Sequence, residues 1–204
     1  MRGWFSRRSG KKGTTKSSSC DCSVKSAEET TTSNSVDSDL VLTKDTPVPE
    51  DAPEELKALR EFIRYKDTHN FEKMIELTDE RCFCNFVDSE TEMPAYEFIA
   101  AFKDKCTSFP DLRFYWKSMK IHERSSDGVA IIIEDYYGIG THTGPAYGFG
   151  PYEPVPTTGI TVRDEPIEVT FTVKDGKITN AVVDAFGKIV GPPGFYTKIG
   201  GLII

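Results

Sequence analysis

Apolar residues recur at helical spacing directly after Pro53, in the segment "PEELKALREFIRYKDTHNF". Leu56, Leu59, Phe62 and Ile63 fall on one helical face, and a proline followed by two glutamates suits a first helical turn. Two later segments, "NFEKMIELTDE" and "MPAYEFIAAFKDKC", repeat the helical spacing, while "RCFCNFVD" between them alternates like a short strand. The pattern predicts three helices, with one short strand between the second and the third.

After Pro110 the hydrophobic period changes from helical to two. The segments "DLRFYWKSMKIHE", "GVAIIIEDYYGIG", "ITVRDEPIEVTFTV" and "KITNAVVDAF" are rich in β-branched and aromatic residues. Two of the connections, "SSDG" and "KDG", have the composition of hairpin turns. The chain therefore predicts an α+β domain over residues 52–204, with helices packed on one face of a curved antiparallel sheet.

Residues 1–51 have a different composition, dominated by Ser, Thr, Lys, Asp and Glu with few large apolar residues. Such a segment cannot bury enough surface to offset its chain entropy, so it is predicted to be disordered. Its first 20 residues hold six basic residues and no acidic one. This composition leaves two interpretations open, a solvated tail on a cytoplasmic protein or an organelle-targeting segment.

Composition narrows the class of protein further. The 204-residue chain is 38% hydrophobic and carries a formal net charge of −7, which fits one acidic domain and argues against a nucleic-acid partner. No apolar run is long enough to span a membrane. The five cysteines are an odd number, so a disulfide framework is not expected, and Cys82 and Cys84 are interpreted as buried thiols on one strand face. No metal-ligand spacing or nucleotide motif is present, so no cofactor is expected.

Three short motifs occur in order along the predicted domain: "FPDLRF", "GTHTG" and "DGKI". Together they resemble the SnoaL-like polyketide cyclase branch of the nuclear-transport-factor-2-like superfamily, over roughly residues 54–187. The resemblance implies a cone-shaped domain in which three helices pack against a strongly bent sheet and enclose an apolar pocket. It also implies a small hydrophobic ligand and a tendency to form homodimers.

The last predicted strand departs from that family. Asn180, Val182 and Phe186 stand where the family usually has Glu, Trp and a catalytic Asp, which leaves Asp184 as the substitute base. With a period of two, these four residues share one strand face, which in the family is the pocket face. A carboxylate among Val182 and Phe186 would have its pKa raised towards a useful range by desolvation.

His142 lies at the end of the strand "AIIIEDYY", where the resemblance places it near the pocket rim. It is predicted either to support catalysis beside Asp184 or to bond the backbone of the glycine-rich turn. Asp135 shares a side with Tyr137 if the strand is regular. The predicted ligand-binding residues are Trp116, Asp135, Tyr137, Tyr147, Asn180, Val182 and Phe186.

Two functions are compatible with these features. The first is cofactor-free proton transfer on a hydrophobic carbonyl compound, leading to cyclisation, isomerisation or dehydration, with Asp184 as base. The second is a non-catalytic ligand-binding or dimerisation domain of the same fold. The long segment 144–158, rich in glycine and aromatic residues, is predicted to be a lid or rim of the pocket in either case.

Overall fold

The fold is given by a computed structural model that describes residues 41–87 and 92–203. The predictions made for the segment up to residue 40, its disorder and its targeting role, lie outside these ranges. No helix within them is both long and apolar enough to cross a membrane.

Three helices precede the third strand: α1 (Glu54–Asp67), α2 (Phe71–Glu76) and α3 (Ala95–Ser108). Each of the two long helices buries an apolar stripe, and Pro53 stands at the N-cap of α1 with two glutamates in the first turn. A fourth helix, α4 (Gly191–Lys198), follows the last strand. Its segment "GPPGFYTK" is a weak helix former in isolation, and it is helical because prolines fit a first turn and Phe195 and Tyr196 are buried.

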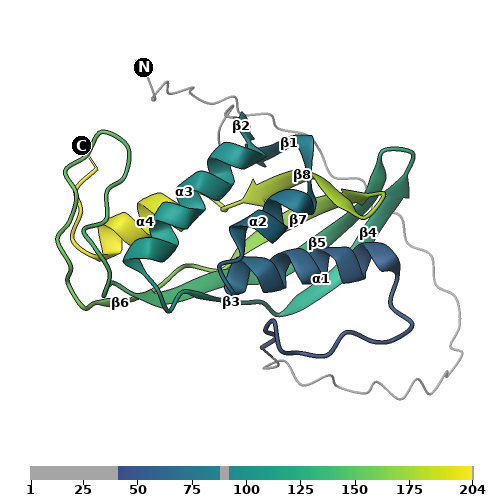
Figure 1. Ribbon diagram of the computed structural model, residues 1–204, viewed down its shortest axis with the longest axis horizontal. Helices are drawn as coiled ribbons and strands as arrows, with labels where there is room; N and C mark the ends of the chain where they lie inside the picture. Colours follow the sequence, from purple (N-terminus) through teal and green to yellow (C-terminus); the bar gives the residue numbers. More distant parts are fainter. Residues whose placement is uncertain (1–40, 88–91, 204) are drawn as a thin grey trace, which may run out of the picture. The chain divides into compact units, whose positions relative to one another are not determined.

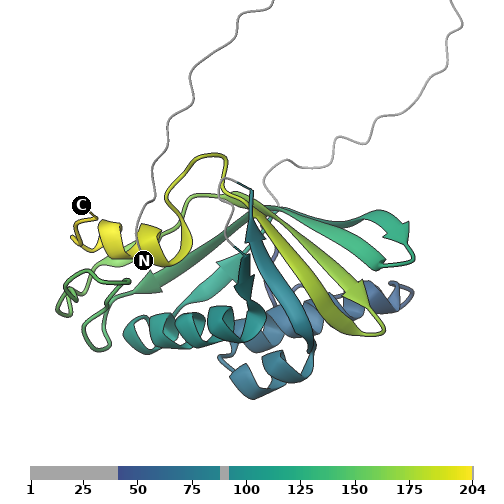
Figure 2. The ribbon, with the colours of Figure 1, turned by 90° about the horizontal axis from the view of Figure 1, so that it is seen from above.

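The strands form one strongly curled sheet, and helices α1, α2 and α3 lie on one face of it (Figures 1 and 2). The hydrogen-bonded order is β2-β1-β8-β7-β5-β3, with β4 and β6 also paired to β5. The bounds are β1 (Thr78–Phe86), β2 (Glu92–Pro94), β3 (Arg113–Tyr115), β4 (Ser118–Ser125), β5 (Gly128–Thr141), β6 (Thr161–Arg163), β7 (Ile167–Lys174) and β8 (Lys177–Asp184).

The sheet is mixed, which corrects the prediction of an antiparallel sheet. Strand β1 runs parallel to β8, with Cys84 opposite Ala181, while the other pairs are antiparallel. Hairpin signals report only on strands that are neighbours in sequence. They could not reveal that a strand from the helical half of the chain pairs with the last strand.

A bulge at Asp135 divides the long strand β5 into two halves. Asp135 has a φ of 52°, and the pairing of β5 with β7 shifts between Ile133 and Tyr136. Odd-numbered residues such as Ile131 and Ile133 are buried before the bulge, whereas Tyr136 is buried after it. One extra residue thus moves the following side chains to the opposite face of the sheet.

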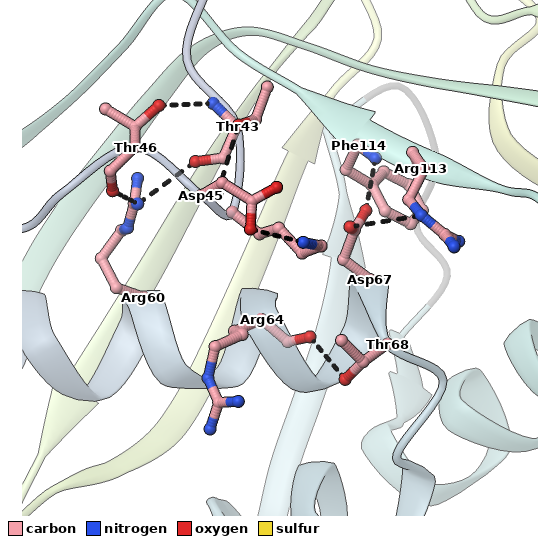
Figure 3. Close-up of polar contacts among 10 residues, drawn as sticks. Thr43, Asp45, Thr46, Arg60, Arg64, Asp67, Thr68, Arg113 and Phe114 are labelled. Carbon is pink, nitrogen blue, oxygen red and sulfur yellow. Dashed lines mark hydrogen bonds and ion pairs between the residues drawn. The ribbon is translucent and has the colours of Figure 1, made fainter.

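Residues 42–46 pack against the domain, although composition assigned them to the tail. The backbones of Leu42 and Trp116 exchange two hydrogen bonds of 2.7 and 3.1 Å. Arg60 on α1 donates to the carbonyl oxygens of Thr43 and Thr46 (Figure 3). The guanidinium carbon of Arg60 also lies 4.8 Å from the centre of the Trp116 ring. The packed part of the chain therefore begins before residue 52.

Candidate functional site

Two lysine side chains are buried between the helices and the inner face of the curled sheet. Lys66, near the end of α1, is 6% exposed, and Lys105, on α3, is 4% exposed. A lysine is rarely buried this deeply without a paired carboxylate. These two amines therefore mark the candidate site.

Aromatic rings surround the Lys66 amine. Its Nζ lies between 4.2 and 5.7 Å from four ring centres, those of Phe98, Phe102, Phe114 and Tyr136. Nζ also donates a 3.0 Å hydrogen bond to the Tyr136 hydroxyl oxygen. Tyr136 is the residue that the β5 bulge turns inward. Helix α1 and the bulged strand β5, which are distant in sequence, thus bring the Lys66 amine and the Tyr136 phenol together in apolar surroundings.

The neighbouring carboxylate does not neutralise Lys66. Asp67 accepts a 2.7 Å hydrogen bond from the backbone N–H of Phe114, and it faces Arg113 Nε at 3.8 Å (Figure 3). Burial therefore lowers the pKa of the Lys66 amine to about 8, although several acidic groups nearby act in the opposite direction. Burial raises the pKa of the Tyr136 hydroxyl well above its ordinary value. At neutral pH a fraction of Lys66 is an unprotonated base, while Tyr136 keeps its proton.

The second amine, Lys105, lies one turn further along α3 than Phe102. Its Nζ lies 3.5 Å from the centre of the Phe195 ring on α4. Burial lowers the pKa of Lys105 to about 7. The charge of Asp164 acts to raise this pKa, and the charge of Lys66 acts to lower it further. Three residues along a helix advance about 4.5 Å, so the Lys66 cage and the Lys105 amine are adjacent regions of one interior.

Asp164 follows β6 and is 8% exposed. Its Oδ2 accepts a 2.7 Å hydrogen bond from the backbone N–H of Gly191, at the start of α4. Its Oδ1 is buried and has no hydrogen-bond partner among the residues described. Burial raises the pKa of Asp164, and the charge of Lys105 opposes this rise. Asp164 and Lys105 thus interact electrostatically without forming a close ion pair.

The structure places Asp184 on the other face of the sheet. Asp184 pairs with Glu168 across β7, and Asn180 and Val182 pair with Thr172 and Thr170, whereas the intervening Ala181 is buried. Directly opposed residues share a face, so these three side chains point away from the helices. These three residues share one face as the period of two predicted, but it is the outer face, whereas the resemblance implied the pocket face. Asp184 Oδ1 accepts a 2.9 Å bond from the backbone of Phe186, which is 59% exposed.

His142 is fully buried and lies on the inner side, so it is not brought together with Asp184. Its Nδ1 is 3.2 Å from Thr158 Oγ1, and its Nε2 is 3.0 Å from the carbonyl oxygen of Pro145. Its ring stacks on Phe109 with centres 5.0 Å apart. Both ring nitrogens are thus occupied by the glycine-rich segment, which matches the structural alternative predicted for this residue.

The remaining predicted ligand-binding residues do not form one site. Trp116 and Tyr147 are buried, the first beneath Leu42 and the second against Phe109. Tyr137 faces outward after the bulge, where it stacks on Tyr115 and lies under the guanidinium of Arg163. Asn180 accepts a 2.9 Å hydrogen bond from Asn85 on the outer face. Tyr137 was predicted to face inward because the strand was assumed to be regular, and the bulge at Asp135 turns it outward.

An open depression of about 320 Å³ also lies near the β5 bulge, outside the Lys66 and Lys105 region. Asp135 and Phe186 border it, so two of the predicted residues do meet there. Its full lining is Lys117, Glu134, Asp135, Ile167, Glu168 and Phe186. The charged lining on the outer face suits a polar contact better than an apolar ligand.

The cysteine thiols lie in the same interior as the amines. Cys82, Cys84 and Cys106 are buried, and burial raises the pKa of these thiols to about 12, 11 and 12 respectively. They are therefore protonated at neutral pH. Over residues 41–87 and 92–203, no group of three or more His, Cys, Asp or Glu side chains is arranged to hold a metal ion.

Solved structures with the same fold were found, although no protein-family model and no curated protein sequence matches the chain. AclR from Streptomyces galilaeus, provisionally named a hydroxylase, is 16% identical with a TM-score of 0.54 over 72% of this chain and 81% of that protein. AusH from Aspergillus nidulans is 13% identical, with a TM-score of 0.49 over 72% and 92%. A protein from Jannaschia sp. CCS1, provisionally named a SnoaL-like polyketide cyclase, is 16% identical with a TM-score of 0.46 over 67% and 90%.

Proteins provisionally named polyketide cyclases, one of them SnoaL-like, are among the solved structures similar to this chain. At these identities the likeness establishes a shared fold and nothing about activity. Any function has to be argued from the side chains of this chain.

Proposed function

We propose that this domain binds a small hydrophobic carbonyl compound between its helices and sheet and catalyses cofactor-free proton transfer there. The observation that carries the proposal is the contact between Lys66 Nζ and the Tyr136 hydroxyl, buried within four aromatic rings. This pair replaces Asp184 and His142 in the role predicted from the sequence. The rings supply an apolar lining, and the amine and the phenol are the polar groups that would orient a ligand.

The chemistry divides between the two polar groups. The unprotonated Lys66 amine accepts a proton from the carbon next to the carbonyl group, for which a base with a pKa near the working pH is best suited. Tyr136 accepts its hydrogen bond from Lys66, so the phenolic hydrogen is left to donate to the carbonyl oxygen. That donation stabilises the negative charge that develops on the oxygen, most strongly where water is excluded.

The experiment measures exchange of the α-hydrogens of benzylacetone for deuterium in deuterium oxide by NMR. We expect the wild-type protein to accelerate exchange, with a rate that rises with pH to a plateau above about pH 8, because only the neutral amine is a base. Lys66→Met should lower the protein-dependent rate by about 100-fold or more. Lys103→Met, which changes an exposed lysine on α3, is the matched control and should leave the rate unchanged.

Equal exchange by the wild-type protein and Lys66→Met would overturn the catalytic proposal. A second candidate function, ligand binding or dimerisation without catalysis, is favoured by the same aromatic cage, because rings can stabilise an ammonium group without any reaction. Under that alternative, benzylacetone binds or fails to bind, and its hydrogens exchange no faster than in buffer.

A further inference from the structure

The Lys105 and Asp164 side chains are not used by the proton transfer just described, yet both are buried in the adjacent part of the interior. Lys105 Nζ faces the Phe195 ring and has no hydrogen-bond acceptor among the residues of the described ranges. Asp164 Oδ1 likewise lacks a donor. A buried acceptor thus lies unsatisfied near a buried lysine, which costs about 1–3 kcal/mol if nothing donates to the carboxylate oxygen.

The fold holds Asp164 in this position from the side of α4. Gly191 donates to Oδ2, and Gly194 lets the helix approach, because a Cβ at that position would lie 2.9 Å from Asp164 Oδ1 and 2.7 Å from the carbonyl oxygen of Ile189. The carboxylate is therefore fixed through one oxygen, and its other oxygen is left for a different partner.

The spacing of the two groups limits which ligand could satisfy both. Lys105 and Asp164 both contact α4, at Phe195 and at Gly191 respectively, and among the described residues no ion pair joins them. The charge of each also acts on the pKa of the other. A group between them has to donate a hydrogen bond to the carboxylate oxygen and accept one from the amine. A hydroxyl group does both, whereas a ketone oxygen only accepts and an ammonium group only donates.

We infer that Lys105 and Asp164 form a subsite for a hydroxyl group of the ligand, so that the preferred ligand is a hydrophobic hydroxy-carbonyl compound. The inference rests on the proposed function, which places the carbonyl group at Lys66 and Tyr136. The two polar groups of such a ligand would lie along α3, with the carbonyl group beside Phe102 and the hydroxyl group one helical turn further on.

Two probes that differ by a single hydroxyl group test the inference. One is benzylacetone, and the other is its β-hydroxy analogue, the aldol adduct of benzaldehyde and acetone. Binding of each is measured by isothermal titration calorimetry with the wild-type protein, Lys105→Met, Asp164→Asn and the control Lys103→Met. We expect the hydroxy analogue to bind the wild-type protein and the control at least about 10-fold more tightly than benzylacetone.

The preference for the hydroxy analogue should fall to less than about 3-fold in Lys105→Met and Asp164→Asn, while the affinity for benzylacetone changes little. Asp164→Asn keeps an acceptor for Gly191, and circular dichroism spectra identify any variant that fails to fold. A crystal structure of the wild-type protein with the hydroxy analogue should place its hydroxyl oxygen within hydrogen-bond distance of both side chains.

The failures of the two proposals are distinguishable. Equal wild-type affinity for the two probes, together with Lys66-dependent exchange, would overturn the hydroxyl subsite and leave the proposed function standing. Such a result would mean that a water molecule satisfies the two groups, and that replacing it with the ligand hydroxyl does not increase the affinity. If the wild-type protein neither binds benzylacetone nor accelerates its exchange, the proposed function is overturned, and the subsite inference with it.

Discussion

Lys66 and Lys105 lie at positions where a charged side chain lowers the stability of the fold. Each lies on an apolar helical stripe, Lys66 after Phe62 and Ile63 and Lys105 after Phe102. Taking an ammonium group out of water costs several kcal/mol, and well-packed apolar residues at such sites are often more stabilising. Residues that lower stability are typical of functional sites.

These two lysines could have been found from the sequence, because a charged residue in the apolar register of an amphipathic helix is visible without coordinates. Asp164 could not, because it follows a three-residue strand and nothing near it indicates that it is buried. Asp184 was selected because the resemblance placed it at the pocket face. The register of β8 shows that face to be the outer one.

The pH dependence of stability should report the burial of Lys105. Its pKa is about 7 in the folded protein, below the ordinary value of 10.5, so the unfolded chain binds more protons between these values. The free energy of unfolding contributed by this group therefore rises as pH increases from about 7 to about 10. Lys105→Met should be about 1–4 kcal/mol more stable than wild type near neutral pH, and this advantage should shrink as the pH rises.

Urea unfolding of both proteins at about pH 7 and about pH 9 measures the two effects. Lys103→Met serves as the control, because its side chain is exposed in both states. A stability difference that is independent of pH would show that Lys105 keeps an ordinary pKa.

At the scale of elements, one bulge decides which tyrosine faces the interior. Strand β5 was correctly expected from its period-two pattern, yet Tyr137 was expected to face inward in place of Tyr136. The positive φ of Asp135 shifts the alternation by one residue, and a pattern of β-branched residues gives no sign of this. The position of β5 in the sequence was therefore easier to predict than the sheet face on which its side chains lie after the bulge.

The segment that precedes α1 is another element-scale case. Its apolar content is low, but Leu42 pairs with Trp116 and Arg60 is anchored on Thr43 and Thr46. These contacts depend on tertiary partners, Arg60 on α1 and the more distant Trp116, which composition does not report.

Removing residues 41–51 should destabilise the domain. A chain that begins at residue 52 should be about 1–3 kcal/mol less stable than one that begins at residue 41, because it leaves the buried Trp116 uncovered and the Trp116 backbone N–H without its acceptor. Thermal unfolding of the two truncated proteins measures the difference. Leu42→Ala in the longer chain should reproduce part of the loss, and equal melting temperatures would contradict the expectation.

On the scale of the whole molecule, access to the buried amines depends on elements outside the main sheet. Lys105 is covered by Phe195 of α4, and α4 is attached to the segment 144–158 by the bond from the Tyr196 hydroxyl to the carbonyl oxygen of Glu153. Phe149 and Tyr152 pack near the same tyrosine ring. The α+β class and curled sheet were predicted from the sequence, but this covering helix was not, since prolines and glycines are weak helix formers.

We expect α4 to open more readily than the sheet. Few elements contact α4, so its backbone amides from Phe195 to Lys198 should exchange with solvent at least about 10-fold faster than those of Ile131 and Ile133 on β5. Hydrogen exchange followed by mass spectrometry measures both groups in one experiment. Exchange of α4 as slow as that of β5 would mean that ligands must enter by another route.

The parallel pairing of β1 with β8 also governs when this protein can fold during its synthesis. Strand β1 is made early, but its long partner ends at Asp184, so a growing chain holds β1 with only the three-residue β2 beside it until nearly the whole domain has been translated. Pairing between strands so distant in the sequence forms slowly, and an unpaired strand edge invites association with other chains. A ribosome that pauses before residue 184 would therefore leave the edge of β1 that faces β8 unpaired, which makes the nascent chain a substrate for chaperones until its last strand emerges.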